Sequence, residues 1–186
     1  MIAILLANGF EEIEALTPLD VLRRAGLDAK TVSITDEKMV TGSHGISVIA
    51  DFAQNEVDLT KIDYAIFPGG LPGAEYLDKS LFTDKVIEAV KENGGGFAAI
   101  CAAPMVLGRR GLLKGRKATC YPGFENELTG AEISDLNAVT DGNITTAIGM
   151  GASLEFALEI VKVFKGDVES KKLASATLPQ RAVKNS

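Results

Sequence analysis

The sequence predicts an α/β fold in which a mainly parallel sheet lies between layers of helices. The continuous apolar run 2–7 is typical of a parallel strand covered on both faces, and 63–67 predicts another buried strand. Segments with helical spacing, such as 81–93 and 152–165, alternate with the strands. No repeat or linker interrupts the 186 residues, so we expect a single domain over 1–186 that ends in a loose polar tail at 179–186.

The first half of the chain predicts a helix, a second strand and a β excursion. Residues 11–26 favour a helix because acidic residues cluster at the start, arginines at the end, and a glycine closes the segment. Pro18 should kink or break this helix. A strand is expected at 30–34. Short β segments at 39–50 are expected to leave the main sheet.

The second half of the chain predicts a short strand, a hairpin and the last helices. The short strand is expected at 117–120. Asp141-Gly142 between apolar segments is a strong signal for a two-residue β-hairpin, with strands at 137–140 and 143–148. An amphipathic helix follows and stops at a glycine, and a further helix is expected at 171–178.

Residues 96–104 predict a buried strand that stops at Cys101 and turns sharply into a helix. Small alanines leave room for the reversal, and Pro104 suits the first helical turn. This is the geometry of a nucleophile elbow, which holds one reactive side chain in strain above a sheet. The helix N-terminus would lower the pKa of the Cys101 thiol below the roughly 8.5 of a free thiol. A cysteine packed as a small hydrophobe is the alternative.

Three segments follow the carboxyl ends of predicted parallel strands, namely 8–14, 68–74 and 101–104. Ligands bind at these ends in such sheets, so we expect the segments to converge on one mouth. Gly69 and Gly70 offer N–H groups that approach a ligand without Cβ obstruction. Together with the N–H of Ala102 they suit an oxyanion hole. A tight turn that needs glycine for its own backbone is the alternative.

Glu14 is the acidic residue most suited to this mouth. It lies on the same side of its predicted helix as Thr17 and Val21, so it would face inward. Burial near a thiol would raise the pKa of its carboxyl, which could then donate a hydrogen bond to the thiolate. A solvated acidic first turn is the alternative. His44 is expected in a surface loop, because no neighbour in the sequence orients it.

Composition argues against several classes of function. A net charge of −6 without any basic run argues against a nucleic-acid partner. No apolar run reaches membrane-spanning length and the start lacks a signal peptide, so we expect a cytoplasmic protein without a membrane partner. With one histidine, no zinc site is expected. Cys120, the second cysteine, is a packed hydrophobe, a resolving thiol for Cys101 or a surface thiol.

Four segments together resemble the ThiJ/PfpI superfamily, and most of all the branch of the Parkinsonism-associated protein deglycase and its bacterial ThiJ-like relatives. They are 10–14, 67–70, 99–104 and 155–157. The resemblance implies a flavodoxin-like three-layer sandwich, usually homodimeric. It also implies that Cys101 is the nucleophile and that Glu14 is the protonated partner of its thiolate. By the same resemblance, the N–H groups of Gly70 and Ala102 form the oxyanion hole.

The resemblance implies a cysteine-dependent enzyme without a cofactor. Such an enzyme would act on reactive dicarbonyls or their protein adducts, as a glutathione-independent glyoxalase or a deglycase. The alternative is a redox-sensing stress protein or holdase chaperone that uses oxidation of Cys101. A peptidase is not expected, because the protease-like branch has a histidine directly after the nucleophile and this chain has Ala102.

The possible pocket around the nucleophile departs from the resembled branch at two positions. Tyr121 stands where the branch has a histidine, and His44 stands where a related arginine would be. Arg24 agrees with the branch, and Gly69 completes the possible pocket. In a homodimer, His44 could approach the pocket of the partner subunit.

Overall fold

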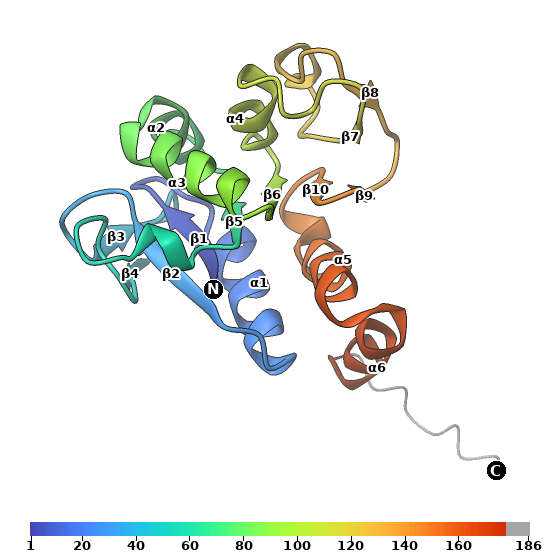
Figure 1. The fold of residues 1–186 in the computed structure, drawn as a ribbon, viewed down its shortest axis with the longest axis horizontal. Coiled ribbons are helices and arrows are strands. Elements are labelled where there is room, and N and C mark those ends of the chain that lie inside the picture. The colour runs from blue at the N-terminus through green and yellow to red at the C-terminus, as the bar shows by residue number, and fades with distance from the viewer. Residues whose placement is uncertain (178–186) are drawn as a thin grey trace.

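A six-stranded sheet runs through the centre of the structure, a computed structural model that describes residues 1–177. Its order is β2-β1-β5-β6-β10-β9, and every neighbouring pair is parallel except β9 and β10 (Figure 1). The strands are β1 (Ile2–Leu6), β2 (Ala29–Ser33), β5 (Tyr64–Phe67), β6 (Gly96–Ile100), β9 (Ala138–Asp141) and β10 (Ile144–Ala147). Counted along the chain, the five parallel strands follow the order 2-1-3-4-5, which is the flavodoxin-like order.

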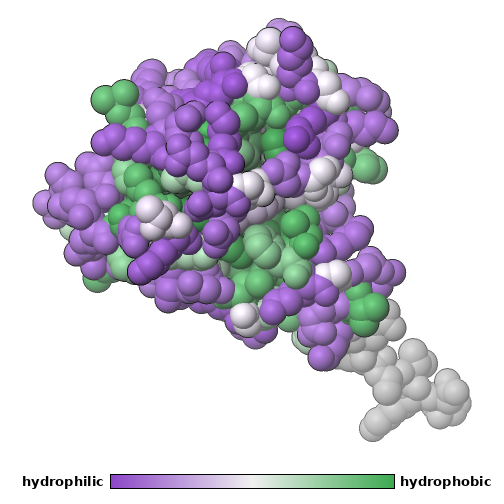
Figure 2. Space-filling view, viewed as in Figure 1, coloured by the Kyte–Doolittle hydropathy of each residue, from purple (hydrophilic) through white to green (hydrophobic). Residues whose placement is uncertain are grey.

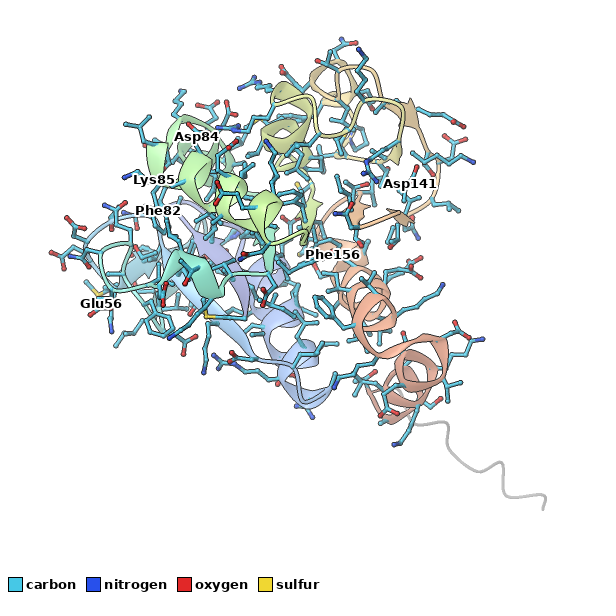
Figure 3. The ribbon with its side chains drawn as sticks, viewed as in Figure 1. Glu56, Phe82, Asp84, Lys85, Asp141 and Phe156 are labelled. Carbon is cyan, nitrogen blue, oxygen red and sulfur yellow. The ribbon has the colours of Figure 1, made fainter. Side chains whose placement is uncertain are left out.

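Helices cover both faces of this sheet. One face carries α1 (Glu12–Arg24), α5 (Ser153–Lys165) and α6 (Asp167–Thr177). The other carries α2 (Gly73–Lys79), α3 (Leu81–Glu92) and α4 (Pro104–Arg109). Figure 3 shows Phe156 on α5 and Phe82 on α3, and these two rings belong to the separate cores on either side of the sheet. The three-layer sandwich with a mainly parallel sheet is therefore confirmed.

Strand β1 shows why the central runs are apolar throughout. Ala3 and Leu5 pack into one core, whereas Ile2, Ile4 and Leu6 pack into the other. Side chains alternate across a strand, so a strand with helices on both faces needs apolar residues at every position. Such a strand runs through the middle of the sheet, and its carboxyl end lies beside those of its parallel neighbours.

Two small sheets lie outside the central one. Strands β3 (Met39–Thr41) and β4 (Ser47–Ile49) form a hairpin, which confirms the predicted β excursion. Strands β7 (Lys117–Ala118) and β8 (Glu132–Ile133) pair in parallel, and β8 was not predicted from the sequence. Short 3-10 turns stand at Leu59–Lys61, Glu125–Glu127 and Met150–Ala152.

The helices differ from expectation in three places. Helix α1 continues through Pro18 without a break, since its inner face is held against the sheet by buried residues. Helix α2 was not predicted, because its seven residues are too few to show a helical period. Helix α6 begins at Asp167 rather than Lys171. The expected tail at 179–186 lies outside the described residues, and the single domain stays a prediction.

Within residues 1–177, no helix combines the length and the apolar character that crossing a membrane requires.

Candidate active site

Cys101 occupies the sharp turn between β6 and α4. Its φ is 65°, and it is the one non-glycine residue with positive φ within residues 1–177. This left-handed conformation costs an ordinary residue about 1–2 kcal/mol, so neighbouring contacts must hold it in place. The Cys101 N–H donates to the Ala147 carbonyl at 2.9 Å, and the Tyr121 N–H donates to the Cys101 carbonyl at 2.8 Å. The predicted strained elbow is confirmed.

Glu14 reaches the elbow from the first turn of α1. Its side chain is only 1% exposed, so the inward orientation is confirmed and the solvated first turn is wrong. The turn is fixed by the Glu11 carboxylate, which accepts a hydrogen bond from the Glu14 N–H at 2.8 Å. Glu14 Oε2 accepts from the Gly69 N–H at 2.9 Å. No N–H or O–H group reaches Glu14 Oε1 within the described part of the chain.

The glycine loop after β5 closes the site from the third side. A Cβ at Gly69 would lie 2.6 Å from Glu14 Oε2 and 2.7 Å from Cys101 Cβ, so only glycine fits between the two side chains. The Glu14 carboxyl and the N–H groups of Gly70 and Ala102 lie near enough to the Cys101 thiol to act on its pKa. The three segments that the sequence places at strand ends therefore do converge.

Burial and mutual charge govern the ionisation of Cys101 and Glu14. Desolvation raises the pKa of Glu14 to about 7, although hydrogen bonds from Cys101 and Gly69 oppose the shift. Burial, followed by the charge of an ionised Glu14, raises the pKa of the Cys101 thiol, against the lowered value expected from the sequence. Because each negative charge disfavours the other, the two groups share one proton over a range of pH. The carboxyl is thus suited to accept and return a proton near neutral pH.

Two residues of the possible pocket lie elsewhere in the single chain. Arg24 is exposed and pairs with Asp20 at 2.6 Å on the outer side of α1. His44 has a side chain that is 71% exposed, as expected for a surface loop, and its Nδ1 lies 2.9 Å from Glu12 Oε2. That ion pair raises the pKa of His44. A role for His44 at the pocket of a partner subunit stays a prediction.

Glu12 is a buried residue that the sequence did not single out. Its carboxylate accepts hydrogen bonds from the His44 N–H at 2.7 Å and the Ser43 hydroxyl at 3.4 Å. Burial raises the pKa of Glu12, but hydrogen bonds from His44 outweigh it and bring the pKa to about 2. Glu12 and His44 are far apart in the sequence. They meet because the turn of the β3–β4 hairpin, which carries His44, lies against the start of α1.

One trio within residues 1–177 has the spacing of metal ligands. Glu11, Glu12 and His44 offer ligand atoms within 4.8 Å of one another, which the sequence did not predict. Two of these side chains already serve other groups. Glu11 caps α1, and Glu12 holds the His44 loop.

Cys120 is buried, as the small-hydrophobe alternative expects, with 4% exposure. Burial raises the pKa of its thiol to about 11, and the charge of Glu125 adds to the shift. Tyr121, next in the chain, is half exposed at the edge of the elbow.

Two surface grooves flank this region, and neither contains Cys101 in its wall. The larger, about 680 Å³, lies along the outer side of α1 and includes Ile13, Leu16 and Leu154. The other, about 500 Å³, is bounded by residues 121–122, Asn137 and residues 148–152. The face of the molecule drawn in Figure 2 is mostly hydrophilic, and its apolar residues gather near the middle. Residues 149–151 turn the chain into α5 and also line the second groove.

Comparisons with known proteins agree with this geometry. Residues 1–163 match the profile of the DJ-1/PfpI family. The chain is 36% identical over 174 residues to Protein DJ-1 homolog B of Arabidopsis thaliana. This alignment covers 93% of this chain but only 40% of that protein. It is 30% identical over 169 residues to a protein of Pyrococcus abyssi named deglycase, covering 88% of this chain and 99% of that one. The solved structure of oxidized Toxoplasma gondii DJ-1 aligns with a TM-score of 0.90 at 34% identity, over 95% of this chain and 97% of that one.

Proposed function

The chain belongs to the DJ-1/PfpI family, and on that premise we propose that it is a cysteine-dependent enzyme for reactive dicarbonyls or their protein adducts. It would act as a glutathione-independent glyoxalase or as a deglycase. The observation that carries this proposal is the contact of one strained thiol, Cys101, with the buried carboxyl of Glu14 and two backbone N–H groups. The Pyrococcus relative named deglycase supports it.

The proposed reaction on an α-oxoaldehyde needs only these groups. The sulfur of Cys101 adds to the aldehyde carbon, and its proton passes to the new oxygen through Glu14, which gives a hemithioacetal. The N–H groups of Gly70 and Ala102 stabilise the oxyanion that develops during addition. Glu14 then moves the proton on the former aldehyde carbon to the neighbouring carbon. That transfer oxidises the first carbon to a thioester and reduces the second to an alcohol.

Water completes the cycle by cleaving the thioester. The products are a 2-hydroxy acid and the free Cys101 thiol, so methylglyoxal plus one water gives lactate with no outside oxidant or reductant. For a protein adduct, the same addition to the carbonyl carbon would precede release of the amine. The buried Glu14, with its raised pKa, is suited to each proton transfer near neutral pH.

Lactate formation from methylglyoxal by the purified protein tests the proposal. Wild type is expected to form lactate, Cys101→Ser to form none, and Cys120→Ser to keep the wild-type rate because its buried thiol lies outside the proposed chemistry. The absence of lactate in wild type, with protein-bound adducts of methylglyoxal also left intact, would contradict it. Equal lactate from wild type and Cys101→Ser would do the same.

A redox role is the second candidate, favoured by the partial exposure of Cys101 and by the two N–H groups beside its sulfur. Those N–H groups could equally stabilise a sulfinate. Mild peroxide is then expected to add two oxygens to Cys101. Formation of an intramolecular disulfide, seen as a loss of two hydrogens, would make Cys120 a resolving thiol after all. Suppression of aggregation that survives Cys101→Ser would favour a holdase.

We also propose that the active form is a homodimer. The groove along α1 places exposed Ile13 beside Leu16 and Leu154, an apolar surface that a second copy would cover. Such a contact would bring the His44 loop of each copy near the other. Sedimentation is expected to give a dimer for wild type and a monomer for Ile13→Glu, whereas a monomeric wild type would contradict the proposal.

A further inference from the structure

The groove bounded by residues 121–122, Asn137 and residues 148–152 begins at the backbone of the nucleophile. The Cys101 N–H donates to the Ala147 carbonyl, and the Tyr121 N–H donates to the Cys101 carbonyl, at 2.9 and 2.8 Å. One wall of the groove therefore begins at Tyr121, whose backbone is hydrogen-bonded to that of Cys101. The other wall begins at Ile148, the residue after Ala147. The elbow that carries Cys101 therefore stands at the head of this groove, although Cys101 itself is not in its lining.

The walls of this groove are apolar and include an aromatic ring. The larger apolar side chains of the lining are Tyr121, Pro122, Ile148 and Met150, and no residue of the lining is charged. Gly149 leaves room for the Tyr121 ring beside the turn, since a Cβ there would come within 3.3 Å of the ring. Flat aromatic and aliphatic walls bind uncharged apolar groups by burying their surface.

A negatively charged side chain lies at the rim of the groove. Asn137, the one amide in the lining, donates from Nδ2 to the carboxylate of Glu155 at 3.4 Å. That carboxylate disfavours an anionic substituent in the groove, because like charges repel and a dry wall cannot solvate them. The groove thus selects against carboxylate and phosphate groups and in favour of neutral alkyl or aryl groups.

We propose that this groove is the substrate subsite that receives an uncharged apolar substituent, above all an aryl ring, on the carbonyl that Cys101 attacks. The proposal rests on the proposed dicarbonyl chemistry and adds a substrate class to it, namely aryl- and alkyl-substituted α-oxoaldehydes. Tyr121 and Met150 are the specificity-determining side chains. Their place in the groove gives residues 149–151 a role beyond the turn into α5.

Two variants change the groove while leaving Cys101 and Glu14 in place. Gly151→Leu fills open space, because no atom lies within 4 Å of a Cβ at that position and its φ is not in the left-handed region. Met150→Glu places a charge on the wall, and an acidic residue ahead of α5 suits the helix dipole, so this variant should fold. Met39→Glu is the matched control, because Met39 is also exposed but lies on the β3–β4 hairpin.

The first measurement is the ratio of kcat/KM for phenylglyoxal to that for methylglyoxal. Gly151→Leu and Met150→Glu are expected to lower this ratio about tenfold, the scale of losing an apolar contact in a specificity pocket. Met39→Glu is expected to leave it at the wild-type value. An unchanged ratio in both groove variants would overturn the subsite while leaving the dicarbonyl chemistry intact.

The second measurement needs no turnover. The rate constant for alkylation of Cys101 is compared between N-phenyl-iodoacetamide and iodoacetamide, in a Cys120→Ser background so that one thiol reacts. The wild-type groove is expected to favour the phenyl reagent, and both groove variants to lose that preference. If no dicarbonyl is turned over but this preference stands, the proposed function fails and the subsite survives. Equal preference in wild type and variants would overturn the subsite.

Discussion

The carboxyl of Glu14 accepts a 2.9 Å hydrogen bond from the Gly69 N–H, and this contact fixes the acid of α1 beside Cys101, which follows a different strand. Gly69 follows β5, and Cys101 follows β6, which is the neighbouring parallel strand. Because the strands are parallel, their ends meet at one edge of the sheet. The proposed proton chemistry of the site depends on the narrow space that this glycine leaves.

Gly69→Ala is expected to separate the acid from the thiol. The new methyl group would overlap Glu14 Oε2 and Cys101 Cβ, so one side chain must move. We expect lactate formation to fall at least tenfold and the free energy of unfolding to fall by about 1–3 kcal/mol. Steady-state kinetics and urea unfolding measure the two effects.

Gly111→Ala is the control for strain alone. Its φ of +70° strains an alanine, but no atom lies within 4 Å of the new Cβ. Gly111→Ala should therefore have a lower free energy of unfolding than wild type, while each folded molecule keeps the wild-type rate of lactate formation. Wild-type activity in Gly69→Ala would show that the contact between Glu14 and Cys101 tolerates displacement, and proton transfer would then not depend on the space at Gly69.

Glu14 should make the stability of the protein fall as the pH rises. The folded-state pKa of Glu14 is about 7 against an ordinary 4.5. A raised pKa in the folded state means that the stabilising contribution is complete below pH 4.5 and is lost as the pH rises through 7. Relative to Glu14→Gln, wild type should lose about 2 kcal/mol of unfolding free energy between about pH 5 and pH 8.

Urea unfolding of both proteins at the two pH values measures this difference. The comparison with Glu14→Gln cancels titrations elsewhere in the chain, because both proteins share them. A difference that stays constant with pH would mean that Glu14 has an ordinary pKa and is not desolvated in the folded protein.

The titration of His44 tests the ion pair with Glu12. His44 is the single histidine of the chain, so its ring signals in NMR need no assignment among several. Hydrogen bonding to the Glu12 carboxylate raises the pKa of His44 above 6.5. Glu12→Gln should bring the pKa back toward 6.5, whereas Glu11→Gln should change it much less. A wild-type His44 that titrates at or below 6.5 would contradict the pair.

The sequence predicts the elements whose signals are local. The apolar run at 2–7, the hairpin signal Asp141-Gly142 and the reversal at Cys101 all correspond to elements of the structure. The alternation of strands and helices along the chain also predicts where the site lies. It indicates parallel strands, and the carboxyl ends of parallel strands lie at the same edge of the sheet. The inward face of Glu14 follows from helical spacing once the helix is placed.

Other features depend on contacts that no local pattern reveals. Glu12 is hydrogen-bonded to His44, which is 32 residues away in the sequence, and no sequence pattern predicts that these two residues meet. The pKa of Cys101 is raised by burial and by the neighbouring carboxylate. These two effects outweigh the lowering that the sequence predicts from the helix N-terminus. The groove at 148–152 lies where the Tyr121 ring approaches Gly149, which is a contact between two loops.

The proton shared by Cys101 and Glu14 is central to the proposed chemistry, and the pH dependence of alkylation measures it most directly. The rate of Cys101 alkylation by iodoacetamide is followed from about pH 4 to pH 11 in a Cys120→Ser background. In wild type the first proton of the pair leaves Glu14 near pH 7, and the resulting charge holds the pKa of the thiol high, so the inflection in alkylation should lie well above the roughly 8.5 of a free thiol. In Glu14→Gln that charge is removed and burial alone raises the pKa of the thiol, so the inflection should move to lower pH than in wild type. The same inflection in both proteins would show that Cys101 and Glu14 share no proton.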